Sequence, residues 1–331
     1  MKEGGVFDFE SLLRLLLLGI YVVTVAVSVL RVEECYTTCE DRHDLVIEFA
    51  QCLLTATLPI SLYHTWDHLT NFSKPLLQSQ VVRIIWLVPM LCIEAYLSVL
   101  FVQQALYFQA AREMYEAYVI HCFMRFILQT LGDGSTLSSR LATFPASAGA
   151  HKPPCCCLPR WEMGADFVTK CRTGVFQYVV VRFSTSLLAV FLFSVGLHQE
   201  GQFGITRPYV WLTFVNCCSQ SYALYSLLLF YLCVHKELQD MRPFAKFLSI
   251  KLMLFCSWWQ ALLIGIAVLY GRIEAGGGHS ARENAVLLRC SIISVEMLVA
   301  ALAFMGAFPV SEFVGQRKSK EGKSGVRKAG A

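Results

Sequence analysis

The sequence predicts an all-α integral membrane protein, a polytopic bundle of seven core transmembrane helices plus an N-terminal hydrophobic helix. Of its 331 residues, 56% are apolar and only 16% are charged, whereas soluble domains carry about 25% charged residues. The apolar residues form uninterrupted runs of about 20 residues, the length at which a helix crosses a bilayer. Such runs disfavour a β-barrel, whose strands alternate over about 10 residues.

Eight stretches are long and apolar enough to cross a membrane. They are residues 12–30, 45–63, 84–106, 113–131, 175–197, 209–234, 250–271 and 286–309. The first stretch has two interpretations, because the small residues AVS at 26–28 follow an apolar core as they do before a signal-peptide cleavage site. We therefore expect eight spans, or seven if the first is a cleaved signal.

The spans divide the chain into four predicted parts. These are an N-terminal hydrophobic segment with an exoplasmic loop (1–44), a seven-helix transmembrane core (45–310), a cytoplasmic cysteine-containing loop within that core (132–174) and a basic disordered cytoplasmic tail (311–331).

The distribution of lysine and arginine predicts the orientation, since cytoplasmic flanks are enriched in both. The side that holds the N-terminus, loop 132–174 and the C-terminus carries 19 of the 28 basic residues, and the opposite flanks carry 7. We therefore expect that side to be cytoplasmic and loop 198–207 to lie outside. The basic run 317–328 suits an anionic inner leaflet and equally a solvated tail.

Three neighbouring cysteines stand between prolines in KPPCCCLPRW at 152–161. In a reducing cytoplasm, disulfides are disfavoured, and structural zinc sites need thiols that are separated by two to four residues. Palmitoylation of Cys155, Cys156 and Cys157 is the favoured interpretation, and unmodified thiols are the alternative. In the outer acidic loop, Cys35 and Cys39 are candidates for a small disulfide.

Ordered motifs along the chain resemble those of one membrane protein family. They include ISLYHTWDHL at 60–69, RIIWLVPM at 83–90, REMYEAYVIHCFM at 112–124, PPCCCLPRWEMG at 153–164 and KFLSIKLMLFCSWWQA at 246–261. With these motifs, the chain resembles the organic solute transporter alpha / transmembrane protein 184 family, most closely the transmembrane protein 184C-like branch.

The resemblance implies a multi-pass protein of the plasma membrane or of endosomal or vacuolar membranes. In the alpha branch, such proteins move steroid conjugates and bile acids by facilitated exchange, together with a single-span beta subunit. For this chain, we expect a facilitative carrier of amphipathic organic solutes, sterol conjugates or organic anions. The alternative is a non-transporting protein that organises membrane traffic or signalling. Expected partners are membrane lipids, a small amphipathic solute, and a beta-like subunit or a second copy of the chain.

Ionisable residues at mid-depth of a span are costly and usually face a bundle interior or a watery cavity. Glu94 lies about 16 Å beyond Arg83 along its span, Arg182 lies about 15 Å past Arg172, and Glu296 is similarly deep. Two carboxylates and one guanidinium predict a buried charge cluster. One interpretation is structural, in which Arg182 pairs with a carboxylate, and the other is recognition of a substrate headgroup or a coupling ion.

Neutral polar residues extend the predicted substrate or ion pathway. Asn216, Ser219 and Gln220 are spaced i, i+3, i+4 and share one helical face. Such a stripe either holds helices together through amide hydrogen bonds or lines a path. Gln260, after two tryptophans, has the same two interpretations.

One charged pair is predicted from local spacing alone. Arg112 and Glu116 are four residues apart, so their side chains can form an ion pair, which we place near the outer surface.

Enzyme classes find no support in the motifs. The sequence has no HExxH, GxSxG or phosphate-binding glycine loop, so we expect neither an enzyme nor a cofactor or metal. Nucleic-acid binding is disfavoured as well, because the basic tail is short and lacks interleaved aromatics.

Overall fold

The computed structural model describes residues 9–38, 42–132, 134–145, 149–151, 159–197, 206–235, 243–276 and 278–313. In these ranges the chain is helical and forms no named β-strand. The helices are α1 (Phe9–Thr38), α2 (Arg42–Thr70), α3 (Pro75–Ile85), α4 (Leu87–Leu100), the 3₁₀ turn η1 (Val102–Gln104), α5 (Ala105–Leu131), α6 (Gly134–Ala142), α7 (Ala165–Ser194), α8 (Pro208–Val234), α9 (Pro243–Leu269) and α10 (Ala281–Ala307).

Local sequence signals explain where several helices begin. Prolines occupy the first positions of α3 and α8, where the missing N–H costs nothing. Helix α10 begins with a capping box: the Ser280 side chain accepts from the Glu283 backbone N–H, and the Glu283 carboxylate accepts from the Ser280 N–H. The capping box therefore fixes the residue at which α10 begins.

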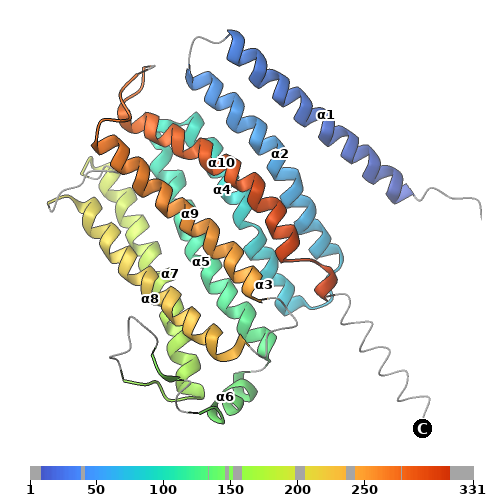
Figure 1. Ribbon diagram of the computed structural model, residues 1–331, viewed down its shortest axis with the longest axis vertical. Helices are drawn as coiled ribbons and strands as arrows, with labels where there is room; N and C mark the ends of the chain where they lie inside the picture. Colours follow the sequence, from blue (N-terminus) through green and yellow to red (C-terminus); the bar gives the residue numbers. More distant parts are fainter. Residues whose placement is uncertain are drawn as a thin grey trace, which may run out of the picture.

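The long helices lie side by side in a bundle, with α1 at one edge and α8 at the other (Figure 1). Helix α1 packs on α2, α2 and α10 pack on α4, and α4 packs on α5. On the other side α5 packs on α7, α7 packs on α8, and α9 lies against α10. Helices α4 and α5 contribute many of the buried apolar side chains of the core, among them Leu91, Ala95, Phe123 and Phe126, which are almost fully buried.

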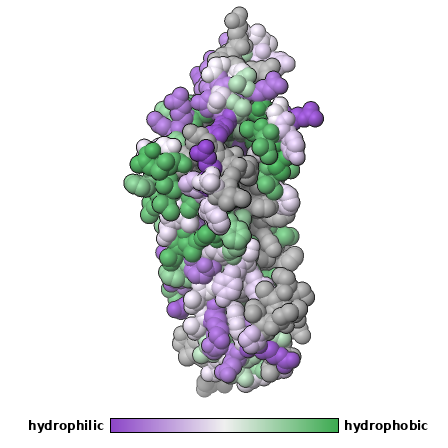
Figure 2. All heavy atoms as spheres, turned by 90° about the vertical axis from the view of Figure 1, so that its left-hand side faces the viewer, coloured by the Kyte–Doolittle hydropathy of each residue, from purple (hydrophilic) through white to green (hydrophobic). Residues whose placement is uncertain are grey.

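Six helical segments of the described chain are long and apolar enough to cross a membrane. They are Leu15–Thr38, His43–Thr70, Pro75–Leu100, Ala165–Ser194, Pro208–Val234 and Ala281–Phe313. Large apolar side chains are exposed on them, among them Leu30 at 61%, Phe191 at 61% and Val299 at 63%. Figure 2 shows hydrophobic residues as green patches on one face of the molecule, with hydrophilic residues between them. Exposed apolar surface on this scale suits lipid as the surrounding solvent.

The all-α membrane architecture is thus confirmed, whereas the count of seven or eight spans stays a prediction. Helices α5 and α9 have 27 residues each and do not belong to the six. In α5, the charged residues Arg112, Glu113, Glu116 and Arg125 lower the hydropathy.

Several helices begin before their predicted apolar stretches, and α7 does so by the largest margin. Residues 175–197 were predicted as a span after a loop at 132–174, but α7 already starts at Ala165 and α6 also lies within that loop. Tertiary contacts explain the extension: Phe167 and Cys171 are fully buried, and the Phe167 ring stacks on Phe230 of α8 with ring centroids 6.2 Å apart.

Candidate functional site

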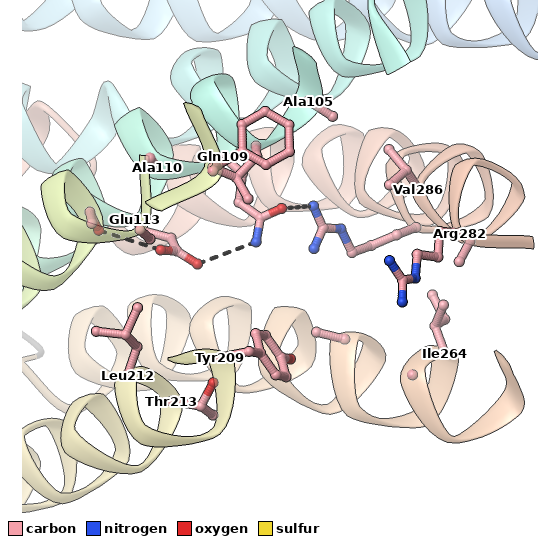
Figure 3. A pocket seen from close by; sticks show the side chains of 18 of the residues that line it. Ala105, Gln109, Ala110, Glu113, Tyr209, Leu212, Thr213, Ile264, Arg282 and Val286 are labelled. Atoms are coloured by element: carbon pink, nitrogen blue, oxygen red, sulfur yellow. Dashed lines mark hydrogen bonds between the residues drawn. The ribbon is translucent and has the colours of Figure 1, made fainter. Parts of the chain in front are cut away.

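A cavity of about 550 Å³ lies among α5, α7, α8, α9 and α10. It extends from the middle of these helices to the end of the bundle where α5, α8 and α10 begin, since Ala105, Tyr209 and Arg282 all line it (Figure 3). Along α8 the lining runs from Tyr209 to Gln220, which is about 16 Å of helix. Its size falls in the range of about 300–1,000 Å³ that is typical of small-molecule sites.

The wall of the cavity is amphipathic. Apolar lining comes from all five helices and includes Leu106, Ala189, Phe193, Leu212 and Val268. Polar and charged lining includes Gln109, Glu113, Arg182, Thr185, Ser186, Asn216, Gln220, Arg282, Glu283 and Arg289. A solute with an apolar body and a polar or charged end would match such a wall.

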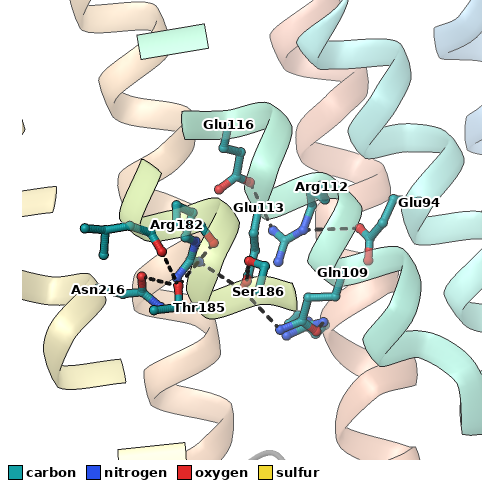
Figure 4. A network of polar contacts seen from close by, with 11 residues as sticks. Glu94, Gln109, Arg112, Glu113, Glu116, Arg182, Thr185, Ser186 and Asn216 are labelled. Carbon is teal, nitrogen blue, oxygen red and sulfur yellow. Dashed lines mark hydrogen bonds and ion pairs between the residues drawn. The ribbon is translucent and has the colours of Figure 1, made fainter. Parts of the chain in front are cut away.

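Arg182 of α7 and Glu113 of α5 form an ion pair in the cavity wall, with Nη2 3.0 Å from Oε1 (Figure 4). The two side chains are 17% and 22% exposed. Glu113 also accepts weak hydrogen bonds from Gln109 Nε2 at 3.4 Å and from Ser186 Oγ at 3.5 Å. The ion pair is therefore partly open to the cavity and linked to neutral donors on both helices.

Two further arginines line the same cavity from α10. Arg289 is 7% exposed and donates to the side-chain oxygen of Gln109, which connects it through Gln109 to Glu113. Arg282 lies next to the start of α10. The carboxylate of Glu283 is engaged in the capping box. The cavity thus has three guanidinium groups in its wall against the carboxylates of Glu113 and Glu283.

A second set of charges lies deeper, outside the cavity lining. Arg112 of α5 is 3.5 Å from Glu94 of α4 through Nε and 3.2 Å from Glu116 through Nη1. The Ser98 hydroxyl donates to Glu94 at 3.1 Å. All three charged side chains are at most 12% exposed. Arg112 is consequently enclosed by two carboxylates between α4 and α5.

The predicted charge cluster of Glu94, Arg182 and Glu296 needs correction. The partner of Arg182 is Glu113, whereas Glu94 belongs to Arg112 and Glu296 accepts a hydrogen bond from Gln260. Neither Glu94, Glu296 nor Gln260 lines the cavity. The position of a residue along its helix follows from the sequence, but rotation about the helix axis depends on contacts with other helices, and that rotation decides which side chains meet.

The Arg112–Glu116 ion pair is observed, with both side chains buried among the helices, and its place near the outer membrane surface stays a prediction. Sequence reasoning missed Glu113 as a functional residue. A signal existed, because Gln109, Glu113 and Glu116 put three polar side chains on successive turns of one helix, which is expensive in lipid.

The polar stripe of α8 divides between its two predicted roles. Asn216 accepts a hydrogen bond from Thr185 of α7 at 2.8 Å and lines the cavity, as does Gln220. Ser219 instead exchanges two hydrogen bonds with Gln177 of α7, at 2.8 and 2.9 Å, and does not line the cavity. Ser219 therefore joins helices, whereas Asn216 and Gln220 face the candidate site.

The cysteine predictions fall largely outside the described residues. Cys155, Cys156 and Cys157 are not among them, so their acylation stays a prediction. Cys35 is buried, but Cys39 is likewise outside the described ranges, and the disulfide is untested. Within the described part of the chain, no group of three or more His, Cys, Asp or Glu residues is arranged to hold a metal ion.

The fold is that of a multi-pass helical membrane protein with a cavity among its helices. Residues 46–313 match the family described as organic solute transporter Ostalpha. Because this match covers most of the chain, the protein belongs to that family.

A curated relative is Protein LAZ1 homolog 1 of Arabidopsis thaliana, which is 28% identical over 280 residues. The aligned region is 80% of this chain, and it spans 57% of the length of that relative. No solved structure matches the chain.

Proposed function

We propose that the protein is a facilitative carrier of amphipathic organic anions, such as sterol conjugates, and that the cavity among α5, α7, α8, α9 and α10 is its substrate site. The observation that carries this proposal is the combination of an apolar wall with the part-exposed guanidinium of Arg182. The apolar wall suits the hydrophobic body of the solute, and guanidinium groups suit sulfate or carboxylate ends because they donate in a planar fork.

In this proposal, α5 and α9 also cross the membrane, which gives eight spans, or seven if the first is a cleaved signal. Each has 27 residues, about 40 Å of helix. Three of the four charges that lower the hydropathy of α5, those of Arg112, Glu113 and Glu116, are paired inside the bundle. The fourth, Arg125, is exposed and lies in the last two turns of the helix. Paired charges that face protein remove the main objection to a span.

The orientation, the family branch, the membrane and the partner that we propose are inferred from the sequence. The charge distribution puts the start of α8 and the start of α10 outside, so the cavity would face the exoplasmic side. The motifs favour the transmembrane protein 184C-like branch, in the plasma membrane or in endosomal or vacuolar membranes. A beta-like subunit, a second copy, or lipids alone would complete the assembly.

Uptake into vesicles reconstituted with the purified protein tests the proposal. Radiolabelled sterol sulfate, a carboxylated sterol conjugate and an uncharged sterol glucoside would be compared, with protein-free vesicles as the baseline. We expect saturable uptake of the two anions. A folded protein that moves none of the three would favour the alternative, a non-transporting organiser of membrane traffic.

A matched pair of variants tests whether the transported anion passes through the cavity. Ala189 lines the cavity, whereas the adjacent Leu188 is 46% exposed on the outside of α7. We expect Ala189→Trp to fill the cavity and to lower anion uptake at least about tenfold, because the larger ring takes the volume of the solute. Leu188→Trp should transport normally, and equal losses in both variants would place the route elsewhere.

A further inference from the structure

Arg182 has hydrogen-bonding capacity that its ion pair does not use. A guanidinium carries five N–H donors, yet only Nη2 contacts Glu113, at 3.0 Å. The Nε of Arg182 is buried and has no hydrogen-bond partner among the described residues. Nε itself is shielded from the cavity, but the Arg182 side chain is 17% exposed and lines the cavity, so a ligand there can reach the open part of the guanidinium.

Apart from its 3.0 Å ion pair with Arg182, Glu113 has only weak contacts among the described residues. Its other two contacts are hydrogen bonds from the neutral donors Gln109 and Ser186, at 3.4 and 3.5 Å, near the limit for such bonds. It is also the most exposed carboxylate of the network, at 22% against 12% for Glu116 and 5% for Glu94. If Arg182 turned to another anion, Glu113 would keep two neutral donors and some access to water.

Two anions cannot share this one cation without cost. An anionic headgroup on Arg182 would lie beside the Glu113 carboxylate, and like charges at such distances repel by several kcal/mol in a poorly hydrated site. Either Glu113 withdraws from Arg182 or the headgroup does not bind. An uncharged solute meets no such competition.

We propose that Glu113 is a built-in counter-ion of Arg182 that the anionic end of the substrate displaces, and that Glu113 thereby sets the affinity of the cavity for anions. This inference rests on the proposed carrier function. In the empty cavity Glu113 neutralises Arg182. In the loaded cavity the headgroup pairs with Arg182, and Glu113 stays hydrogen-bonded to Gln109 and Ser186. The exchange makes anion binding weaker than the cation alone would allow, which favours release on the far side of the membrane.

Equilibrium binding to the purified protein in detergent tests the inference. The probes are a radiolabelled sterol sulfate and the uncharged glucoside of the same sterol. We expect Glu113→Gln to bind the sulfate at least about tenfold more tightly than the unaltered protein, because the competing charge is gone and its neutral replacement still hydrogen-bonds. The affinity for the glucoside should change by less than about twofold.

Two controls separate this effect from a general change in charge or stability. Glu116 is one turn further along α5, on Arg112 and outside the cavity lining, so Glu116→Gln should leave the sulfate affinity within about twofold of that of the unaltered protein. Glu113→Asp keeps the charge but withdraws it from Arg182, and we expect sulfate binding about threefold tighter. This variant decides the matter if Glu113→Gln does not fold.

The outcomes distinguish the two proposals. If the unaltered protein binds the sulfate and the folded Glu113 variants bind it equally well or more weakly, the displacement inference is wrong and the carrier function stands. Equal tightening in Glu116→Gln would also overturn it, because the effect would then be general electrostatics. If neither binding nor uptake of the sulfate occurs in the unaltered protein, the carrier function itself fails.

Discussion

Arg112 and Arg182 both lie inside the bundle and pair with glutamates of the same helix, α5, yet their surroundings differ. Arg112 lies between two carboxylates, Glu94 and Glu116, and is 7% exposed. Arg182 forms an ion pair with one carboxylate, Glu113, while Glu116 acts on it from a greater distance; it is 17% exposed and lines the cavity. The difference shows that pairing alone does not decide the role of a buried charge. The number of counter-ions and the access to the cavity separate a structural cation from one that is available to a ligand.

The largest expected effect is the loss of stability when Arg112 is replaced. Arg112→Gln leaves Glu94 and Glu116 buried without their cation, which should lower the free energy of unfolding by about 3–5 kcal/mol. Arg182→Gln strands only one part-exposed carboxylate that keeps two neutral donors, so we expect a loss of about 1–2 kcal/mol. Thermal unfolding of the two purified variants in one detergent measures the contrast. Equal losses would remove the distinction between the two arginines.

Two adjacent cysteines of α8 test whether the cavity that Arg182 lines is accessible to water. Cys217 lines the cavity, whereas Cys218 is exposed on the outside of the helix, where we expect lipid. A charged thiol reagent reacts with the thiolate in water, so Cys217→Ser should abolish a labelling event that Cys218→Ser preserves. Sterol sulfate should slow that labelling about tenfold. Mass spectrometry of the labelled peptide gives the site, and labelling at Cys218 alone would exclude a watery cavity.

A smaller effect is expected where polar groups only join helices. Gln177 and Ser219 exchange two hydrogen bonds between α7 and α8, and such interhelical bonds contribute about 1 kcal/mol in membranes. Gln177→Leu should therefore lower the free energy of unfolding by about that amount, measured by thermal unfolding. Since neither residue lines the cavity, sterol sulfate uptake should not change. A large loss of uptake in a stable variant would extend the site to this contact.

Local helix geometry made some of these features predictable. The Arg112–Glu116 pair and the shared face of Asn216 and Gln220 follow from spacings of four residues on one helix, and both are observed. Hydropathy identified six segments that the structure shows as long apolar helices, because lipid demands long apolar runs whatever the tertiary structure.

Contacts between helices were not predictable from one sequence. Glu94 was expected in a buried charge cluster and is buried, but it was given the wrong partner, since its cation comes from α5. Glu113 was overlooked because its pairing with Arg182 depends on how α5 and α7 are rotated against each other. Similarly, the early start of α7 depends on the burial of Phe167 against α8, which its polar neighbours in the sequence conceal.

The central claim is that the guanidinium of Arg182 itself contacts the anionic end of the solute, and a double variant tests it most directly. Arg182→Gln with Glu113→Gln removes both charges of the pair, so neither is left buried alone and the protein should unfold near the temperature of the unaltered protein. Uptake of sterol sulfate into vesicles should nonetheless fall at least about tenfold, because the cation is missing, while any uptake of the uncharged glucoside should persist. A well-folded double variant that moves the sulfate at the unaltered rate would contradict the account and leave Arg182 a purely structural residue.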